Sequence, residues 1–73
     1  MKFAKLIGKM REMGISQEAL AKEIGISQTS LNRKLNGHAQ FVFEEINRIC
    51  IALDIKSSNI VDYFFNDVIR NRI

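Results

Sequence analysis

The stretch that decides the fold is residues 16–37, which read SQEALAKEIGISQTSLNRKLNG. Its apolar residues recur at spacings of three and four, the period of an amphipathic helix, and they do not alternate with polar residues as in a strand. Ser16 and Ser27 are both good helix N-caps. We therefore predict two short helices that are joined by only Gly25, Ile26 and Ser27. A joint this short requires a sharp corner between the helices.

The residues at this corner have the sizes that a close crossing of two helices needs. Ala21 is small, so the helices can approach each other there, and Gly25 can adopt the positive φ required where the chain reverses. Ile26 is expected to fill the corner. The inner face is expected to be sealed by Leu20, Ile24 and Leu31, and Leu31 and Leu35 are expected to anchor the second helix. The pattern therefore predicts a helix-turn-helix unit.

The flanking sequence extends the helical pattern over the whole chain, which contains no proline. Three further helices are expected over residues 2–13, over residues 43–53, and from Ser57 or Ser58 through Val68. Gly14 provides a residue for the left-handed end of the first helix, whereas Asp54 stands where a helix-ending glycine is usual. We predict one all-α domain over residues 1–73, with five short helices around a single core.

Composition excludes several classes of protein. Hydrophobic residues make up 47% of the 73 residues, which is enough for a core and too many for a disordered chain. The single cysteine, Cys50, excludes an intrachain disulfide framework. No stretch approaches the roughly 20 apolar residues of a membrane span, and the first residues lack the pattern of a signal peptide. We therefore expect a cytoplasmic protein that does not enter a membrane.

The net charge of +3 is distributed unevenly along the chain. Residues 1–43 carry seven basic and three acidic side chains, whereas residues 44–73 carry four basic and five acidic ones. No acidic residue lies between Glu23 and Glu44. Because a phosphate backbone repels acidic side chains, this window favours a polyanionic partner. The alternative is that the gap arises by chance in a short chain.

Two segments, SQEALAKEIGISQ at 16–28 and LNRKLNG at 31–37, resemble the lambda-repressor and Cro family of helix-turn-helix regulators. The run at 41–53, followed by a short last helix, is also similar, so the resemblance covers nearly the whole chain. It implies a lambda-repressor-like domain that binds duplex DNA sequence-specifically. In that family the second helix of the motif enters the major groove, and the first lies across the DNA backbone.

The resemblance places four candidate base-reading residues on the second motif helix: Gln28, Thr29, Asn32 and Arg33. Helical spacing agrees with this, because Gln28, Asn32 and Asn36 form one row, with Thr29 and Arg33 beside it. Glutamine can pair with adenine, arginine can pair with guanine, and a threonine methyl group can contact thymine. The alternative is a solvated polar helix surface with no role in DNA binding.

The candidate contacts to DNA phosphates are Gln17, Ser27, Lys34, Asn36, His38 and Gln40. Members of the family use a glutamine at the position of Gln17 to contact a phosphate. The same glutamine also braces the glutamine at the start of the second motif helix, here Gln28. Backbone amides at such a helix start can also receive a phosphate. Lys34 stands three residues after Leu31, where many helix-turn-helix proteins have an apolar residue.

A domain this small makes few contacts to one half-site, so a homodimer on a palindromic operator is expected. The two recognition helices would then lie about 34 Å apart. The final helix is apolar, and its dimer contacts are expected to be Ile60, Tyr63 and Phe64.

The expected function is that of a Cro-type transcriptional repressor of phage or prophage origin. The sequence shows no catalytic motif, metal-ligand cluster or phosphate-binding loop, so we expect no enzyme activity, no cofactor and no metal. The alternative is a protein-interaction module, such as an antitoxin or anti-repressor, that uses the same scaffold.

Overall fold

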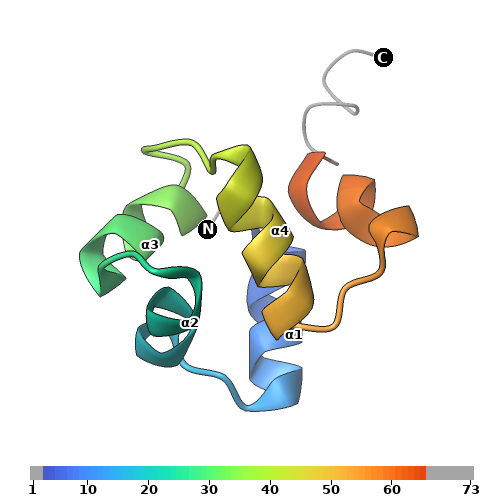
Figure 1. The fold of residues 1–73 in the computed structure, drawn as a ribbon, viewed down its shortest axis with the longest axis horizontal. Helices are drawn as coiled ribbons and strands as arrows, with labels where there is room; N and C mark the ends of the chain where they lie inside the picture. Colours follow the sequence, from blue (N-terminus) through green and yellow to red (C-terminus); the bar gives the residue numbers. More distant parts are fainter. Residues whose placement is uncertain (1–2, 66–73) are drawn as a thin grey trace.

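Four α-helices and a short C-terminal helical region make up the computed structural model, which describes residues 3–65 (Figure 1). The elements are α1 (Ala4–Met13), α2 (Gln17–Ile24), α3 (Gln28–Leu35), α4 (Phe43–Ala52), the 3-10 turn η1 (Ser57–Asn59) and the π-helical turn η2 (Val61–Phe65). There is no strand within the described range. The all-α fold is therefore confirmed. The predicted ends of the first four helices agree with the structure to within two residues.

The last predicted helix differs from the expectation. In place of one continuous α-helix, the chain forms η1 and then η2, with Ile60 in a right-handed helical conformation between them. Serine, asparagine, valine and aromatic residues are all weak helix formers, so packing rather than propensity sets the conformation here. The predicted continuation to Val68 lies outside the described residues.

The predicted helix caps at the motif are confirmed. The Ser16 hydroxyl accepts a hydrogen bond from the Ala19 N–H at 3.0 Å, and the Ser27 hydroxyl accepts one from the Ser30 N–H at 3.0 Å. Each bond satisfies a backbone donor that the first turn of a helix leaves free. Gly25 has a φ of 80°, as the predicted corner requires. The two serines and this glycine therefore set the limits of α2 and the start of α3.

Asp54 takes the left-handed conformation that glycine usually provides after a helix, with a φ of 53°. Aspartate is among the few residues other than glycine that adopt this conformation readily. The Ile55 N–H then reaches back to the Cys50 carbonyl at 2.8 Å and satisfies it. Helix α4 thus ends at the predicted place, and the chain turns toward η1.

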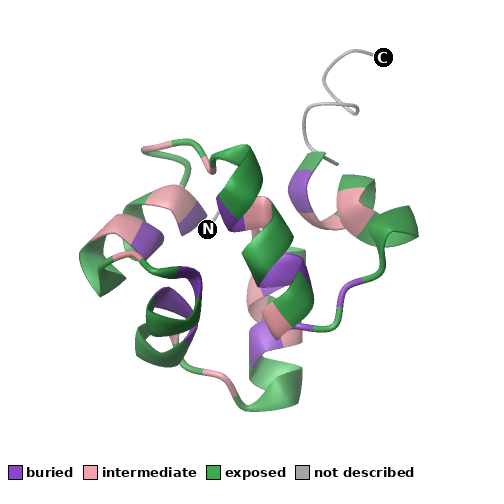
Figure 2. Ribbon diagram, viewed as in Figure 1, coloured by how far each residue is buried: buried purple, intermediate pink, exposed green. Residues whose placement is uncertain are grey.

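The core lies between the four α-helices, where their buried faces meet (Figure 2). It contains Leu6, Met10, Leu20, Ala21, Ile24, Leu31, Leu35, Ile49, Cys50, Leu53, Ile55 and Phe64. The residues predicted to seal the corner are all among them, and Ile26 is half-buried against the same cluster. The core therefore holds α2 and α3 at a fixed angle and leaves the outer face of α3 exposed.

We expect Gly25→Ala to lower the free energy of unfolding by about 2 kcal/mol, and by more than Gly14→Ala does. Both glycines have a positive φ, of 80° and 70°. Only at Gly25 would the new Cβ meet a neighbour, the Arg48 Nη1 at 3.2 Å, whereas nothing lies within 4 Å at Gly14. Urea unfolding of the two variants measures the difference. Equal losses would show that the Arg48 contact contributes nothing.

Candidate nucleic-acid interface

Helices α2 and α3 meet at the sharp corner seen at one end of the molecule (Figure 1). Leu31 and Leu35 on one side of α3 are fully buried. The four candidate base-reading residues lie on its other side and are all exposed, namely Gln28, Thr29, Asn32 and Arg33. The core thus fixes the rotation of α3 and presents this polar face to a partner.

A chain of side-chain amides crosses the exposed surface from α3 to the start of α2. The Asn36 Nδ2 donates to the Asn32 Oδ1 at 3.2 Å and to the Asn32 carbonyl at 3.0 Å. The Asn32 Nδ2 in turn donates to the Gln17 Oε1 at 3.2 Å. The Gln17 Oε1 thus accepts a hydrogen bond from Asn32, and the Gln17 Nε2 group remains as a donor for an anion.

This amide chain corrects one expectation about Gln17. Gln17 was expected to brace Gln28, the first residue of α3, but it accepts its hydrogen bond from Asn32, one turn further along. The polypeptide turns sharply between the end of α2 and the start of α3, so the start of α2 lies beside the middle of α3 rather than beside its first residue. Gln28 makes no side-chain hydrogen bond to the described residues and stays free on the exposed face.

Lys34 does not belong to the exposed face, so its position does not support the predicted contact with a DNA phosphate. Its Nζ lies 2.6 Å from both carboxylate oxygens of Glu45, and the two side chains are only 14% and 12% exposed. The Glu45 Oε1 also accepts the Val42 N–H at 3.0 Å. Lys34 therefore joins α3 to the start of α4.

Glu45 was not among the predicted site residues, although the sequence contains a signal for it. Glu45, Ile49 and Leu53 are spaced by four residues, so they share one row of α4, and the last two are fully buried. An acid on a buried row needs a cationic or hydrogen-bonding partner. Burial raises the pKa of Glu45, but the hydrogen bonds from Lys34 and Val42 and the charges of Lys34 and Arg48 hold it below its ordinary value.

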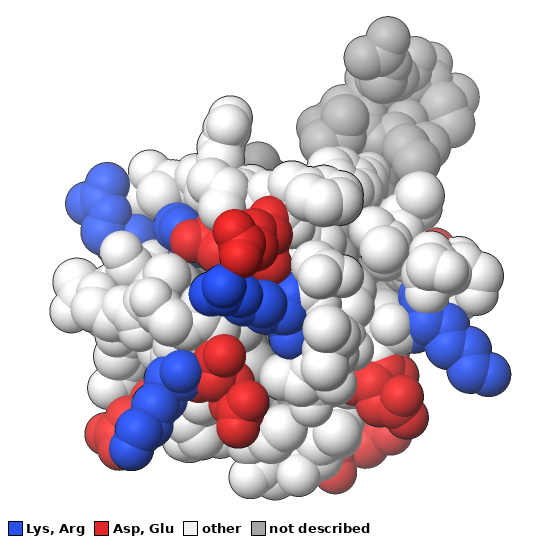
Figure 3. All heavy atoms as spheres, viewed as in Figure 1, with Lys and Arg blue, Asp and Glu red and all other residues white. Residues whose placement is uncertain are grey.

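The remaining candidates for phosphate contacts lie around the exposed face of α3. Ser27 is exposed at the start of α3, and Asn36 is half-buried at its end. His38 and Gln40 are exposed in the loop of residues 36–42 that joins α3 to α4. Figure 3 shows white and blue atoms over α3, whereas red atoms lie over α2 and α4. The structure thus brings α3 and this loop together as one surface that is poor in acidic groups.

A family model described as a Cro/C1-type helix-turn-helix DNA-binding domain matches residues 5–66. The chain belongs to this family. In this Cro/C1-type domain, α2 and α3 form the helix-turn-helix motif, and α3 is the second helix of the motif. In a comparison with curated proteins, no protein matches the chain.

Two further observations concern the described residues of the Cro/C1-type domain. None of the helices in residues 3–65 has the length and apolar character needed to cross a bilayer. Over the same residues, no three His, Cys, Asp or Glu side chains come together as a metal site would require. The family membership makes double-stranded DNA the partner.

Proposed function

We propose that this domain is a sequence-specific transcriptional repressor of the Cro type, from a phage or prophage, that reads duplex DNA with α3. The observation that carries the proposal is the exposed face of α3. There the side chains of Gln28, Thr29 and Arg33 make no hydrogen bond to residues 3–65 and are available to base edges. These three residue types match the hydrogen-bond and methyl groups of the major groove. Asn32 is the fourth base-reading candidate, although one of its amide hydrogens is already used by Gln17.

Contacts with phosphates are proposed to position α3 in the groove. Gln17 has a free amide donor at the start of α2, and the backbone amides that follow Ser27 lie at the start of α3. Asn36, His38 and Gln40 would extend the contact along the loop. Such contacts fix the register of the protein on the duplex but carry little sequence information. The absence of acids between Glu23 and Glu44 supports this arrangement.

A homodimer on a palindromic operator is part of the same proposal, because two half-sites double the contacts of a small domain. Of the three expected dimer contacts, Ile60 and Tyr63 are half-buried and accessible. Phe64 is only 7% exposed and packs in the core against Phe3 and Phe41, so its position does not support the expected dimer contact. A small core needs this ring, which leaves it unavailable to a second copy.

The test is selection of bound sequences from a random pool of duplex DNA, repeated with the double variant Gln28→Ala/Arg33→Ala. We expect enrichment of a palindromic site that the double variant loses, with about a hundredfold loss of affinity for that site. Salt-sensitive background binding should persist, because it depends on phosphate contacts. Arg11→Ala is the control, since it removes one exposed positive charge from α1.

Two results would contradict the proposal. An unchanged selected site in the double variant would exclude α3 as the reading helix. No enrichment at all at moderate salt would leave only nonspecific affinity for DNA. The scaffold would then act as a protein-interaction module, such as an antitoxin or anti-repressor.

A further inference from the structure

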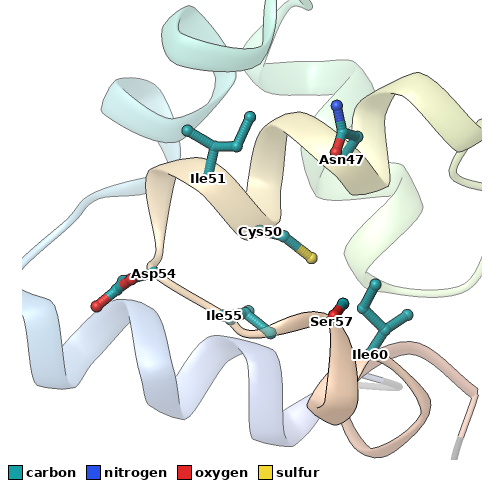
Figure 4. Close-up of a pocket in the computed structure, with 7 residues that line it drawn as sticks. All are labelled: Asn47, Cys50, Ile51, Asp54, Ile55, Ser57 and Ile60. Atoms are coloured by element: carbon teal, nitrogen blue, oxygen red, sulfur yellow. The ribbon is translucent and has the colours of Figure 1, made fainter.

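The outer face of α4 carries large apolar side chains that nothing in the described structure covers. Phe43 is 87% exposed and Ile51 is 74% exposed. Asn47 lies between them, so the three residues are spaced by four and form one row, here named the α4 ridge. Figure 4 shows Asn47 and Ile51 on the same side of α4, whereas Cys50 points toward Ser57 and Ile60. Two exposed apolar groups on a single ridge make it a candidate surface for a protein partner.

We infer that the α4 ridge packs antiparallel against the α4 ridge of a second copy of this chain. The inference rests on the proposed homodimer and names the surface that forms it. In an antiparallel pair centred on Asn47, Phe43 lies opposite Ile51 of the second copy, and Asn47 lies opposite Asn47. The row reads apolar, polar, apolar in both directions, as a twofold interface requires.

The central asparagine suits this arrangement. Its side chain carries both a donor group and an acceptor, so two asparagines facing each other across a twofold axis can exchange hydrogen bonds. A polar residue at the centre of an apolar helix interface also fixes which register the helices adopt. The pair therefore selects the register in which each Phe43 meets an Ile51.

The charges beside the ridge are self-complementary in the same register. Glu44 and Arg48 each follow a ridge residue, so they form the neighbouring row of α4. Within one chain the Arg48 Nη2 donates to the Glu44 Oε1 at 2.6 Å, and the two side chains are 48% and 70% exposed. In antiparallel helices, equivalent flanks face each other. Glu44 of one copy would then lie near Arg48 of the other, twice across the axis.

A shallow hollow continues the surface from α4 toward η1. It is lined in part by Cys50, Ile51, Ile55 and Ile60 (Figure 4). Ile60, one of the dimer contacts expected from the sequence, therefore borders the same surface. The α4 ridge and the exposed row of α3 are on different helices. Pairing through the α4 ridge therefore leaves the base-reading side chains of α3 uncovered.

Cysteine crosslinking of the full chain tests the geometry. The background is Cys50→Ala, which removes the native thiol, with its folding checked by urea unfolding. In this background Asn47→Cys places two thiols at the twofold axis, and we expect rapid formation of a disulfide-linked dimer. Disulfides need Cα atoms within about 7 Å, so few other geometries allow this bond. Val61→Cys, on the exposed surface of η2, is the matched control and should stay monomeric under denaturing, non-reducing conditions.

Sedimentation equilibrium tests the energetics. Ile51→Glu is expected to weaken self-association at least tenfold, because it places a charge in an apolar contact. Val61→Glu makes the same change outside the ridge and should leave the association unchanged. Crosslinking through position 61, or an effect confined to Val61→Glu, would overturn the inference and assign the contact to η2.

Selection from the random DNA pool separates this inference from the proposed function. With Ile51→Glu we expect binding to a single half-site in place of the palindrome. If the native chain stays monomeric at high concentration, free and on DNA, while still enriching one half-site, the α4 pairing is wrong and DNA reading by α3 stands. If it dimerises through Asn47→Cys but enriches no sequence, the pairing stands and the proposed function is wrong.

Discussion

Phe41→Ala is expected to lower the free energy of unfolding by about 3 kcal/mol. The Phe41 ring meets Phe3 edge-on, with centroids 5.3 Å apart, and meets Phe64 edge-on at 5.7 Å. Phe3 and Phe64 are themselves 6.4 Å apart. The three rings hold the start of α1, the end of the loop of residues 36–42, and η2 against one another. Loss of the Phe41 ring therefore leaves a cavity and removes two of the three ring contacts.

Phe43→Ala is the matched control for this prediction, because it makes the same change two residues away at a side chain that is 87% exposed. We expect it to change the free energy of unfolding by no more than about 0.5 kcal/mol. Thermal or urea unfolding at low protein concentration compares the two variants without a contribution from self-association. Similar losses at the two positions would show that the aromatic cluster does not support the loop.

Lys34→Ala is also expected to cost about 3 kcal/mol at neutral pH, because it leaves the Glu45 carboxylate part-buried without its cation. The matched control is the double variant Lys34→Met/Glu45→Leu, which removes both charges and keeps similar volumes. We expect it to be close to the native chain in stability. Urea unfolding measures both. If the double variant lost as much as Lys34→Ala, the stability would depend on the shape of these side chains rather than on pairing of their charges.

The contribution of the Lys34–Glu45 pair to stability should decrease as the pH falls. The pKa of Glu45 is lower in the folded chain than in the unfolded one: burial raises it, but the hydrogen bonds from Lys34 and Val42 and the charges of Lys34 and Arg48 together outweigh that effect. The unfolded chain therefore binds more protons in the acid range. The contribution of Glu45 to stability is present above its unfolded-state pKa and is lost as the pH falls through its folded-state pKa. The gap between the native chain and Lys34→Ala should close below about pH 4.

The fold could be predicted from the sequence because its decisive signals are local. Ser16 and Ser27 cap the helices that follow them, and Gly25 sits where a left-handed turn is required. The spacing of apolar residues identified the inner faces of α2 and α3, because a helix places every third or fourth residue on the same side. The same spacing identified the exposed row of α3, and thus most of the candidate DNA-binding surface.

The features that the sequence did not predict are contacts between residues that are distant in sequence. Lys34 and Glu45 each occupy an apolar position of their own helix, and only the turn through the loop of residues 36–42 brings them together. Gln17 and Asn32 meet because of the angle between α2 and α3. The apolar character of η2 could not show whether the ring of Phe64 or that of Phe65 enters the core. Phe64 does so because Phe3 and Phe41 are already there.

If α3 reads DNA bases as proposed, the hydrogen bonds between Gln17, Asn32 and Asn36 affect how this protein could acquire a new operator. Gln28, Thr29 and Arg33 make no side-chain hydrogen bond to residues 3–65, so substitutions there can alter the preferred bases without disturbing the rest of the surface. Asn32 also donates a hydrogen bond to Gln17. A substitution of Asn32 would therefore alter both the preferred bases and the contact of Gln17 with a DNA phosphate. When related proteins come to prefer different DNA sequences, in nature or by laboratory evolution, the first substitutions should therefore occur at Gln28, Thr29 and Arg33. Asn32 should change last.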